Sequence, residues 1–159
     1  VFAIAIAYLF KFIGFGKKPN KILNTLTFKA YNKNYKLENE WLSKNPNNIS
    51  IYNDDELCGF IFTTNGFINL YKLLKRAFNE KLYKVQNKNL EIFLIAGDND
   101  PVIQNTKKFK QLEQFLNKLG YKNTKSKLYS DLRHEILNEE EYEQIYKDIL
   151  DFFINNKEK

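Results

Sequence analysis

The sequence is poor in several residues on which protein chemistry often depends. Its 159 residues include one histidine, one cysteine, one tryptophan and no methionine. The single cysteine, Cys58, excludes an intramolecular disulfide, so a disulfide-stabilised secreted domain is excluded and the cytoplasm is the expected compartment. Because Cys58 has no second cysteine beside it, and because His134 is followed by Asn138 where a zinc-binding helix needs another histidine, we expect no metal. We also expect no cofactor.

Long apolar runs are missing as well. The opening segment Val1 to Phe10 is apolar, but Lys11 interrupts it before it is long enough to span a bilayer. It also lacks the basic leader of a signal peptide, so we expect it to be the cut edge of a fragment. An apolar content of 43% in a chain of this length is nevertheless ample for a packed core.

Positive charge is in moderate excess, with 25 lysines and arginines against 19 aspartates and glutamates, which gives a formal net charge of +6. The lysines are scattered among asparagines and glutamates instead of forming one stripe, so we do not expect nucleic acid as a partner. A solvated surface is the simplest interpretation. Peripheral contact with an anionic membrane is the next, because lysines flank apolar helices.

The C-terminal half has the pattern of an α/β fold. Leu90 to Ala96 is an almost continuous apolar run, which predicts a buried parallel strand. Thr106 to Leu119 has one apolar face and predicts a helix that ends at Gly120. Lys127 to Tyr129 predicts a second strand, and Glu139 to Asn155 a second helix. The order strand, helix, strand, helix favours a parallel sheet.

The start of the last predicted helix has a second feature. Asn138 stands three residues before Glu141, which is the spacing of a capping box. We therefore expect Asn138 to cap this helix.

The N-terminal half has a different composition, rich in aromatic residues and asparagine. Helical periodicity is visible from Ile22 to Tyr31 and from Phe67 to Phe78. We therefore expect two regions, a helical one over residues 1–83 and an α/β one over residues 84–159, joined by the polar stretch Lys84 to Asn89.

Two polar segments follow the predicted strands. Asp98 and Asp100 lie in the turn after Gly97, and Pro101 favours an extended conformation for Asp100. Carboxyl ends of strands are where α/β sheets place sites. An ordinary polar turn remains open, since turns favour aspartate and asparagine. The turn lacks the ligand set of an EF-hand, which disfavours calcium.

His134 is the only imidazole that the chain offers as a base. It follows Asp100 by 34 positions, with one predicted helix and one predicted strand between them, and this gap suits neighbouring strands. A lone histidine is also often structural, so this interpretation stays open beside the catalytic one.

These segments carry a family resemblance. Tyr129 to Glu139 resembles the histidine motif of the α/β-hydrolase superfamily, in its monoacylglycerol lipase, lysophospholipase and serine aminopeptidase-like branch. Leu57 to Phe67 and Asn32 to Trp41 resemble parts of the cap in bacterial members. The resemblance implies the C-terminal part of an α/β-hydrolase sheet with a helical cap over residues 1–83. It also implies Asp100 as the triad acid, with Asp98 the weaker choice because it falls where the family varies.

By the same resemblance, His134 is the triad base and the protein cleaves carboxylic esters, with monoacylglycerol or lysophospholipid as the expected substrate. The nucleophilic serine should precede the cap. No Gly-x-Ser-x-Gly turn occurs in the 159 residues, so the serine is expected upstream and the chain alone is expected to be inactive. Two alternatives stay open: a non-catalytic binding or lipid-surface module, and a serine aminopeptidase.

Aromatic residues of the expected cap suit an acyl-binding lid, because such pockets are mostly apolar. Ordinary core packing is the competing interpretation. Basic residues beside the apolar stripe, namely Lys72, Lys75 and Arg76, suggest membrane contact. The predicted substrate-binding residues are Phe60, Phe62, Phe67 and Tyr71.

Overall fold

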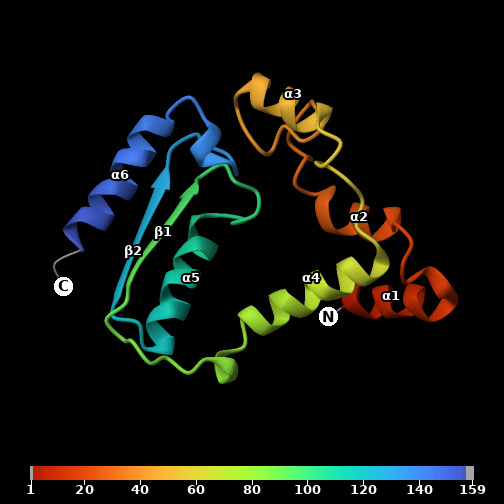
Figure 1. Ribbon diagram of the computed structural model, residues 1–159, viewed down its shortest axis with the longest axis horizontal. Coiled ribbons are helices and arrows are strands. Elements are labelled where there is room, and N and C mark those ends of the chain that lie inside the picture. Colours follow the sequence, from red (N-terminus) through yellow and green to blue (C-terminus); the bar gives the residue numbers. More distant parts are fainter. Residues whose placement is uncertain (1, 157–159) are drawn as a thin grey trace. The chain divides into compact units, whose positions relative to one another are not determined.

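The computed structural model describes residues 2–156 and divides the chain into two compact units (Figure 1). Unit 1 comprises Val1–Asn34 and Asn53–Tyr83, and unit 2 comprises Tyr35–Tyr52 and Lys84–Lys159. Each unit has its own hydrophobic core. None of the described helices is long and apolar enough to cross a membrane.

Unit 1 is helical. It contains α1 (Phe2–Phe10), the short π-helix η1 (Lys11–Phe15), α2 (Lys21–Phe28), α4 (Thr64–Ala77) and the 3₁₀ turn η2 (Glu80–Leu82). Helices α2 and α4 begin with side-chain caps, because the side chains of Asn20 and Thr63 each accept a hydrogen bond from a backbone N–H of the first turn. The helices share one buried core, made of Ala7, Leu23, Phe67 and Ile68.

Unit 2 is built on two parallel strands, β1 (Glu91–Gly97) and β2 (Asn123–Tyr129), which pair in register from Glu91 with Asn123 to Gly97 with Tyr129. Helix α5 (Thr106–Leu119) connects them, and the 3₁₀ turn η3 (Ile136–Asn138) and helix α6 (Tyr142–Asn155) follow β2. Residues 46–52 of α3 (Pro46–Asp54) also belong to this unit.

The two long helices of unit 2 cover opposite faces of the sheet, as Figure 1 shows. Side chains alternate along a strand, so neighbouring positions meet different helices. Phe93 stacks on Phe152 of α6 at 5.2 Å between ring centroids, while Ser126 donates a hydrogen bond to Glu113 of α5. The α6 side holds the buried core of the unit, formed by Tyr129, Leu132, Ile136 and Ile145.

The predicted α/β class and the strand and helix order are confirmed. Helix α5 has the predicted bounds, and Gly120 ends it in the left-handed conformation with φ of 110°. The second strand is longer than Lys127 to Tyr129 and begins at Asn123. Residues 123–126 are polar, and Lys125 and Ser126 are exposed, so an apolar pattern could not predict this part of the strand.

The predicted capping box is wrong. Helix α6 begins at Tyr142, and its N-cap residue Glu141 makes no side-chain cap hydrogen bond. The Asn138 side chain instead donates to Glu135 at 3.1 Å. Asn138 ends the turn η3, so it lies too far ahead of α6 to cap it.

The two units also divide the chain differently from the expected regions 1–83 and 84–159. The boundary between Tyr83 and Lys84 is the same, but residues 35–52 belong with the sheet. Hydrogen bonds from Arg133 and to Glu139 fasten this segment to unit 2. The assignment of residues 1–83 as a cap stays a prediction.

Candidate active site

The site lies where the turns after β1 and β2 meet. The backbone N–H of Asp98 donates to the carbonyl of Tyr129 at 2.9 Å, and that of Asn99 donates to the carbonyl of Leu132 at 3.0 Å. Gly97 permits this approach, because a Cβ there would overlap the backbone of Leu132 and Arg133. The two turns that carry the predicted acid and base are therefore joined through their backbones.

Asp100 is the carboxylate that meets the histidine. Its side chain is 6% exposed, and its Oδ2 lies 3.0 Å from Nδ1 of His134. Its Oδ1 accepts a hydrogen bond from the N–H of Val102 at 2.8 Å, which fixes the orientation of the carboxylate. Asp98 is exposed and accepts instead from the N–H of Asp131 at 2.8 Å. Asp98 therefore joins the two turns and does not bind His134.

One edge of the His134 ring is held by Asp100, and the other edge is accessible. Nδ1 faces Asp100, the side chain is 40% exposed, and Nε2 has no hydrogen-bond partner among residues 2–156. The hydrogen bond to Asp100 raises the pKa of His134 above 6.5; burial opposes this rise, and the negative charges of Asp100 and Glu135 add to it. This geometry suits a general base that is oriented by a carboxylate.

The raised pKa is directly measurable, because His134 is the only histidine of the chain. We expect an NMR titration of its ring to give a pKa above 6.5 in the folded chain and close to 6.5 in urea. Trp41, the only tryptophan, lies 5.1 Å from the His134 ring, so its fluorescence should follow the same titration.

The same shift predicts the sign of a pH effect on stability. Since folding raises this pKa, the stabilisation from protonated His134 is complete below pH 6.5 and is lost as the pH rises through the folded-state value. Comparing urea unfolding of the natural chain and of His134→Gln across this range measures the loss. A folded-state pKa at or below the value in urea would contradict the expectation.

A buried carboxylate lies beneath the histidine turn. Glu139 is 1% exposed. Its Oε1 accepts hydrogen bonds from the N–H groups of Lys44 and Arg133, at 3.1 and 3.2 Å, and its Oε2 from Ser43 Oγ and Lys44 N–H, both at 2.9 Å. Glu139 therefore ties residues 43–44 to the histidine turn.

We expect Glu139→Gln to destabilise unit 2 by about 1–3 kcal/mol, because either orientation of the amide sets an N–H₂ group against a buried donor. Glu140→Gln is the matched control, since Glu140 is exposed, and should change stability by less than about 0.5 kcal/mol. The midpoint of guanidinium unfolding measures both. Equal midpoints for the two variants would show that the bonds of Glu139 do not matter for folding.

The sequence did not single out four residues that shape the site: Tyr35, Trp41, Arg133 and Glu139. The rings of Tyr35 and Trp41 lie beside the guanidinium of Arg133 and the imidazole of His134, respectively. All four lie within the segments that carry the family resemblance, Asn32 to Trp41 and Tyr129 to Glu139, and this is the one signal that could have found them. Glu139 and Arg133 bond to backbone groups of Lys44 and Ser43, which lie 95 and 90 positions away, and no local pattern encodes these contacts.

The predicted substrate-binding aromatics belong to unit 1, whereas Asp100 and His134 belong to unit 2. Phe67 is completely buried, and Phe62 and Tyr71 pack against its core cluster. The Tyr71 hydroxyl also forms a 2.6 Å hydrogen bond with Thr27. Phe60 is 62% exposed. Core packing thus accounts for three of the four residues, and their contact with substrate stays a prediction.

Two serines of the described part of the chain, Ser43 and Ser126, are hydrogen-bonded to glutamates. Ser43 is fully buried and donates to Glu139, and Ser126 donates to Glu113. Neither is bonded to His134. Residues 2–156 place the carboxylate of Asp100 against the imidazole of His134, and they contain no Gly-flanked serine turn.

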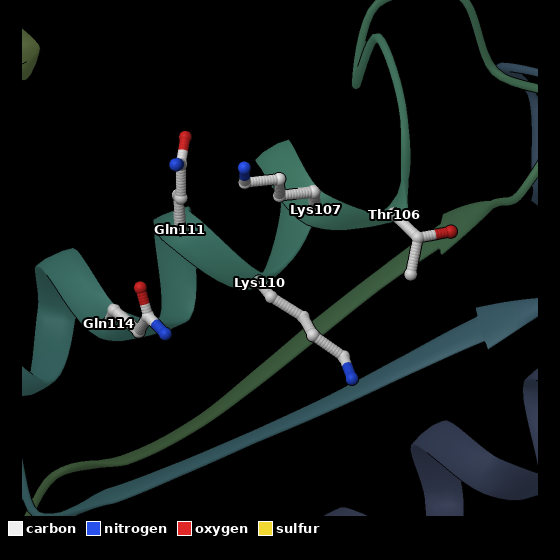
Figure 2. A pocket seen from close by; sticks show the side chains of 5 residues that line it. All are labelled: Thr106, Lys107, Lys110, Gln111 and Gln114. Carbon is white, nitrogen blue, oxygen red and sulfur yellow. The ribbon is translucent and has the colours of Figure 1, made fainter.

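The described residues hold no group of three His, Cys, Asp or Glu side chains arranged to bind a metal ion. One pocket lies along helix α5, and its lining includes neither Asp100 nor His134 (Figure 2). Its polar and basic lining is unlike an acyl pocket, and every lining residue comes from the same helix: Thr106, Lys107, Lys110, Gln111 and Gln114.

Solved structures establish the fold. A highly thermostable carboxyl esterase from Bacillus coagulans matches with a TM-score of 0.75 and 22% identity, over 96% of this chain and 50% of that chain. A lipase in an open form matches with a TM-score of 0.76 and 22% identity, over 94% and 48%. A monoacylglycerol lipase from Paleococcus ferrophilus matches with a TM-score of 0.63 and 18% identity, over 97% and 52%. No functionally curated protein matches.

The fold is therefore that of the α/β hydrolases, and the chain spans about half the length of these structures. The model of one family, described as serine aminopeptidase S33, matches residues 4–141. Because this match covers most of the chain, the protein belongs to the serine aminopeptidase S33 family.

Proposed function

We propose that this chain forms part of a serine hydrolase that cleaves carboxylic esters of lipids, with monoacylglycerol or lysophospholipid as the substrate. The observation that carries the proposal is the 3.0 Å contact between Asp100 and His134 at the carboxyl ends of parallel strands. The esterase and lipase names of the similar structures support ester cleavage. The nucleophilic serine is supplied by a preceding segment of a longer protein.

In this proposal, Nε2 of His134 takes the proton of the serine hydroxyl as its oxygen attacks the ester carbonyl. The imidazolium then gives that proton to the departing alcohol, and the acyl group remains on the serine. His134 next takes a proton from the water that attacks the acyl-serine carbonyl, and it returns that proton to the serine oxygen as the acyl–serine bond breaks and the carboxylic acid leaves. Asp100 keeps the proton of Nδ1 in place and stabilises the imidazolium, while the oxyanion donors come from outside this chain.

The test uses the protein encoded by the complete reading frame. A fluorophosphonate probe should label it, and acyl ester cleavage should disappear in His134→Ala and persist in Asp98→Asn. The 159-residue chain alone should remain unlabelled. A folded full-length protein without labelling would overturn the hydrolase proposal and favour a non-catalytic binding module.

Amide cleavage is the second candidate, and the family name favours it, since the family is that of a serine aminopeptidase. The same acid–base pair serves both reactions, so the pocket decides between them. Rates on matched acyl esters and amino-acid anilides distinguish the two. Faster cleavage of anilides by the labelled protein would replace the lipid ester as substrate.

We also propose that unit 1 contacts anionic lipid. Unit 1 contains ten lysines and arginines and four aspartates and glutamates, so it carries the whole net charge of +6, whereas unit 2 is neutral. On α4, exposed Leu73 and Leu74 lie in the same stretch of helix as Lys72, Lys75 and Arg76. Basic side chains beside exposed apolar ones suit a peripheral membrane surface.

Vesicle co-sedimentation tests this contact. Vesicles rich in phosphatidylserine should bind the chain, and replacing Lys72, Lys75 and Arg76 with alanine should weaken the binding. The matched control replaces three lysines of unit 2, Lys107, Lys108 and Lys110, and should bind as before. Equal loss in both triple variants would reduce the effect to overall charge and contradict a specific surface on unit 1.

A further inference from the structure

The segment 35–44 contacts both turns of the acid–base pair. On the acid side, the Tyr35 hydroxyl donates to the carbonyl of Asn99, the residue before Asp100, at 3.1 Å. On the base side, the N–H of His134 donates to the carbonyl of Trp41 at 3.5 Å, and that of Glu135 donates to the carbonyl of Leu42 at 2.8 Å. One segment therefore holds both turns.

Arg133 fastens this segment. Its Nη1 donates to the carbonyls of Glu40 and Ser43, at 2.6 and 2.8 Å, and its Nη2 donates to the Glu40 carboxylate at 3.4 Å. Its guanidinium carbon lies 4.5 Å from the centre of the Tyr35 ring, within cation–π distance. The side chain is only 18% exposed, so these contacts are shielded from solvent.

These contacts connect Arg133 to both partners of the Asp100–His134 hydrogen bond. Arg133 precedes His134 in the chain, and its guanidinium stacks on Tyr35. Tyr35 holds the carbonyl of Asn99, which precedes Asp100. The two residues that are connected in this way, His134 and Asp100, are the partners of the 3.0 Å hydrogen bond. Arg133 is therefore connected by contacts to both partners.

We propose that Arg133 is a positioning residue, which fixes segment 35–44 against both turns. It thereby holds His134 within hydrogen-bond distance of Asp100 and beside the ring of Trp41. Its relevance to catalysis rests on the proposed hydrolase function. The positioning itself does not, and it can be tested in the 159-residue chain without any activity.

The chemistry of the guanidinium explains why arginine occupies this place. Its planar fork donates to two carbonyls and one carboxylate while its face lies on an aromatic ring. A lysine at the same position keeps the charge but offers a point donor on a flexible stem. Arg133→Lys therefore separates the loss of geometry from the loss of charge.

The test follows the ring of His134 by NMR and the fluorescence of Trp41 in variants shown to be folded by circular dichroism. We expect Arg133→Lys to lower the pKa of His134 toward 6.5, because the hydrogen bond with Asp100 that raises it loosens. The fluorescence change on titration should also shrink, since Trp41 moves from the imidazole. Tyr35→Phe, which removes only the bond to Asn99, should act in the same direction.

Arg133→Met distinguishes a charge effect from a positioning effect, because the two change the pKa of His134 in opposite directions. Loss of a positive charge beside His134 would by itself raise the pKa of the imidazole, whereas loss of positioning lowers it. Should this variant fail to fold, Arg133→Lys and Tyr35→Phe still decide. Lys127→Ala is the matched control, because Lys127 lies over the Tyr129 ring at 4.8 Å on the α6 side of the sheet, and it should leave His134 unchanged.

A folded Arg133→Lys that keeps the natural pKa of His134 and the natural Trp41 titration would overturn the proposal. So would a raised pKa in Arg133→Met together with no change in Arg133→Lys, because Arg133 would then act through its charge alone. Failure of fluorophosphonate labelling would leave these readouts untouched, so the two proposals fail separately.

Discussion

Replacing Gly97 with alanine is expected to separate Asp100 from His134. The added methyl group would overlap the carbonyl group of Leu132 and the carbonyl oxygen of Arg133, which are backbone atoms that cannot rotate away. The histidine turn must therefore shift from the end of β1. Forced overpacking of this kind typically costs about 1–3 kcal/mol, and we expect the upper end of that range because backbone must move.

The shift has two measurable consequences. The free energy of unfolding should fall by about 3 kcal/mol in a guanidinium titration, and the pKa of His134 should drop toward 6.5 as the hydrogen bond with Asp100 is lost. Gly16→Ala is the control, because a Cβ there meets ordinary contacts of 3.4 Å and the backbone is helical with φ of −52°. A Gly97→Ala chain with natural stability and natural His134 titration would refute the close approach.

The sequence predicted what depends on local patterns. The apolar run at β1 and the one-sided face of α5 identified a strand and a helix, because burial on a sheet or a helix face leaves a period in the sequence. The turn that holds Asp98 and Asp100 was predicted to lie beside His134 for a topological reason, and the family resemblance then favoured Asp100 over Asp98. The carboxyl ends of adjacent parallel strands meet at one edge, whatever the residues between them.

The placement of residues 35–52 could not be predicted in the same way. Their partners are backbone carbonyls, which every residue carries, and the buried carboxylate of Glu139, which looks like any helix-start glutamate in the sequence. Glu139 lies before α6 and turns away from it toward Ser43 and Lys44. From the sequence alone, Glu139 could belong to the start of α6 or contact a distant segment. Only the tertiary fold decides between the two, and it places Glu139 against Ser43 and Lys44.

Replacing Asp100 with asparagine should remove the function of the pair without removing its shape. Oδ1 of Asp100 accepts from the N–H of Val102 at 2.8 Å, so the carbonyl oxygen of an asparagine takes that place. Its N–H₂ group then faces Nδ1 of His134, where Oδ2 lies in the natural protein. A donor at this position forces Nδ1 to accept and moves the ring proton to Nε2.

This change in tautomer has a large expected effect. In the proposed serine hydrolase, His134 protonated at Nε2 could not take the serine proton, and loss of the carboxylate in such a triad costs about 10⁴-fold in kcat. In the 159-residue chain, ¹⁵N shifts of the neutral ring should show the proton on Nδ1 in the natural sequence and on Nε2 in Asp100→Asn. The pKa of His134 should fall as well, because the bond to Asp100 is the main cause of its rise.

Asp98→Asn is the matched control for this substitution, since Asp98 is a carboxylate two residues away whose Oδ1 accepts from a backbone N–H. An asparagine oxygen replaces it there without facing the imidazole, so the tautomer and the pKa of His134 should stay as they are. If both variants altered the ring equally, the effect would come from the charge of the turn and not from the hydrogen bond. If neither did, Asp100 would not orient His134, and the acid–base pair would lose its chemical basis.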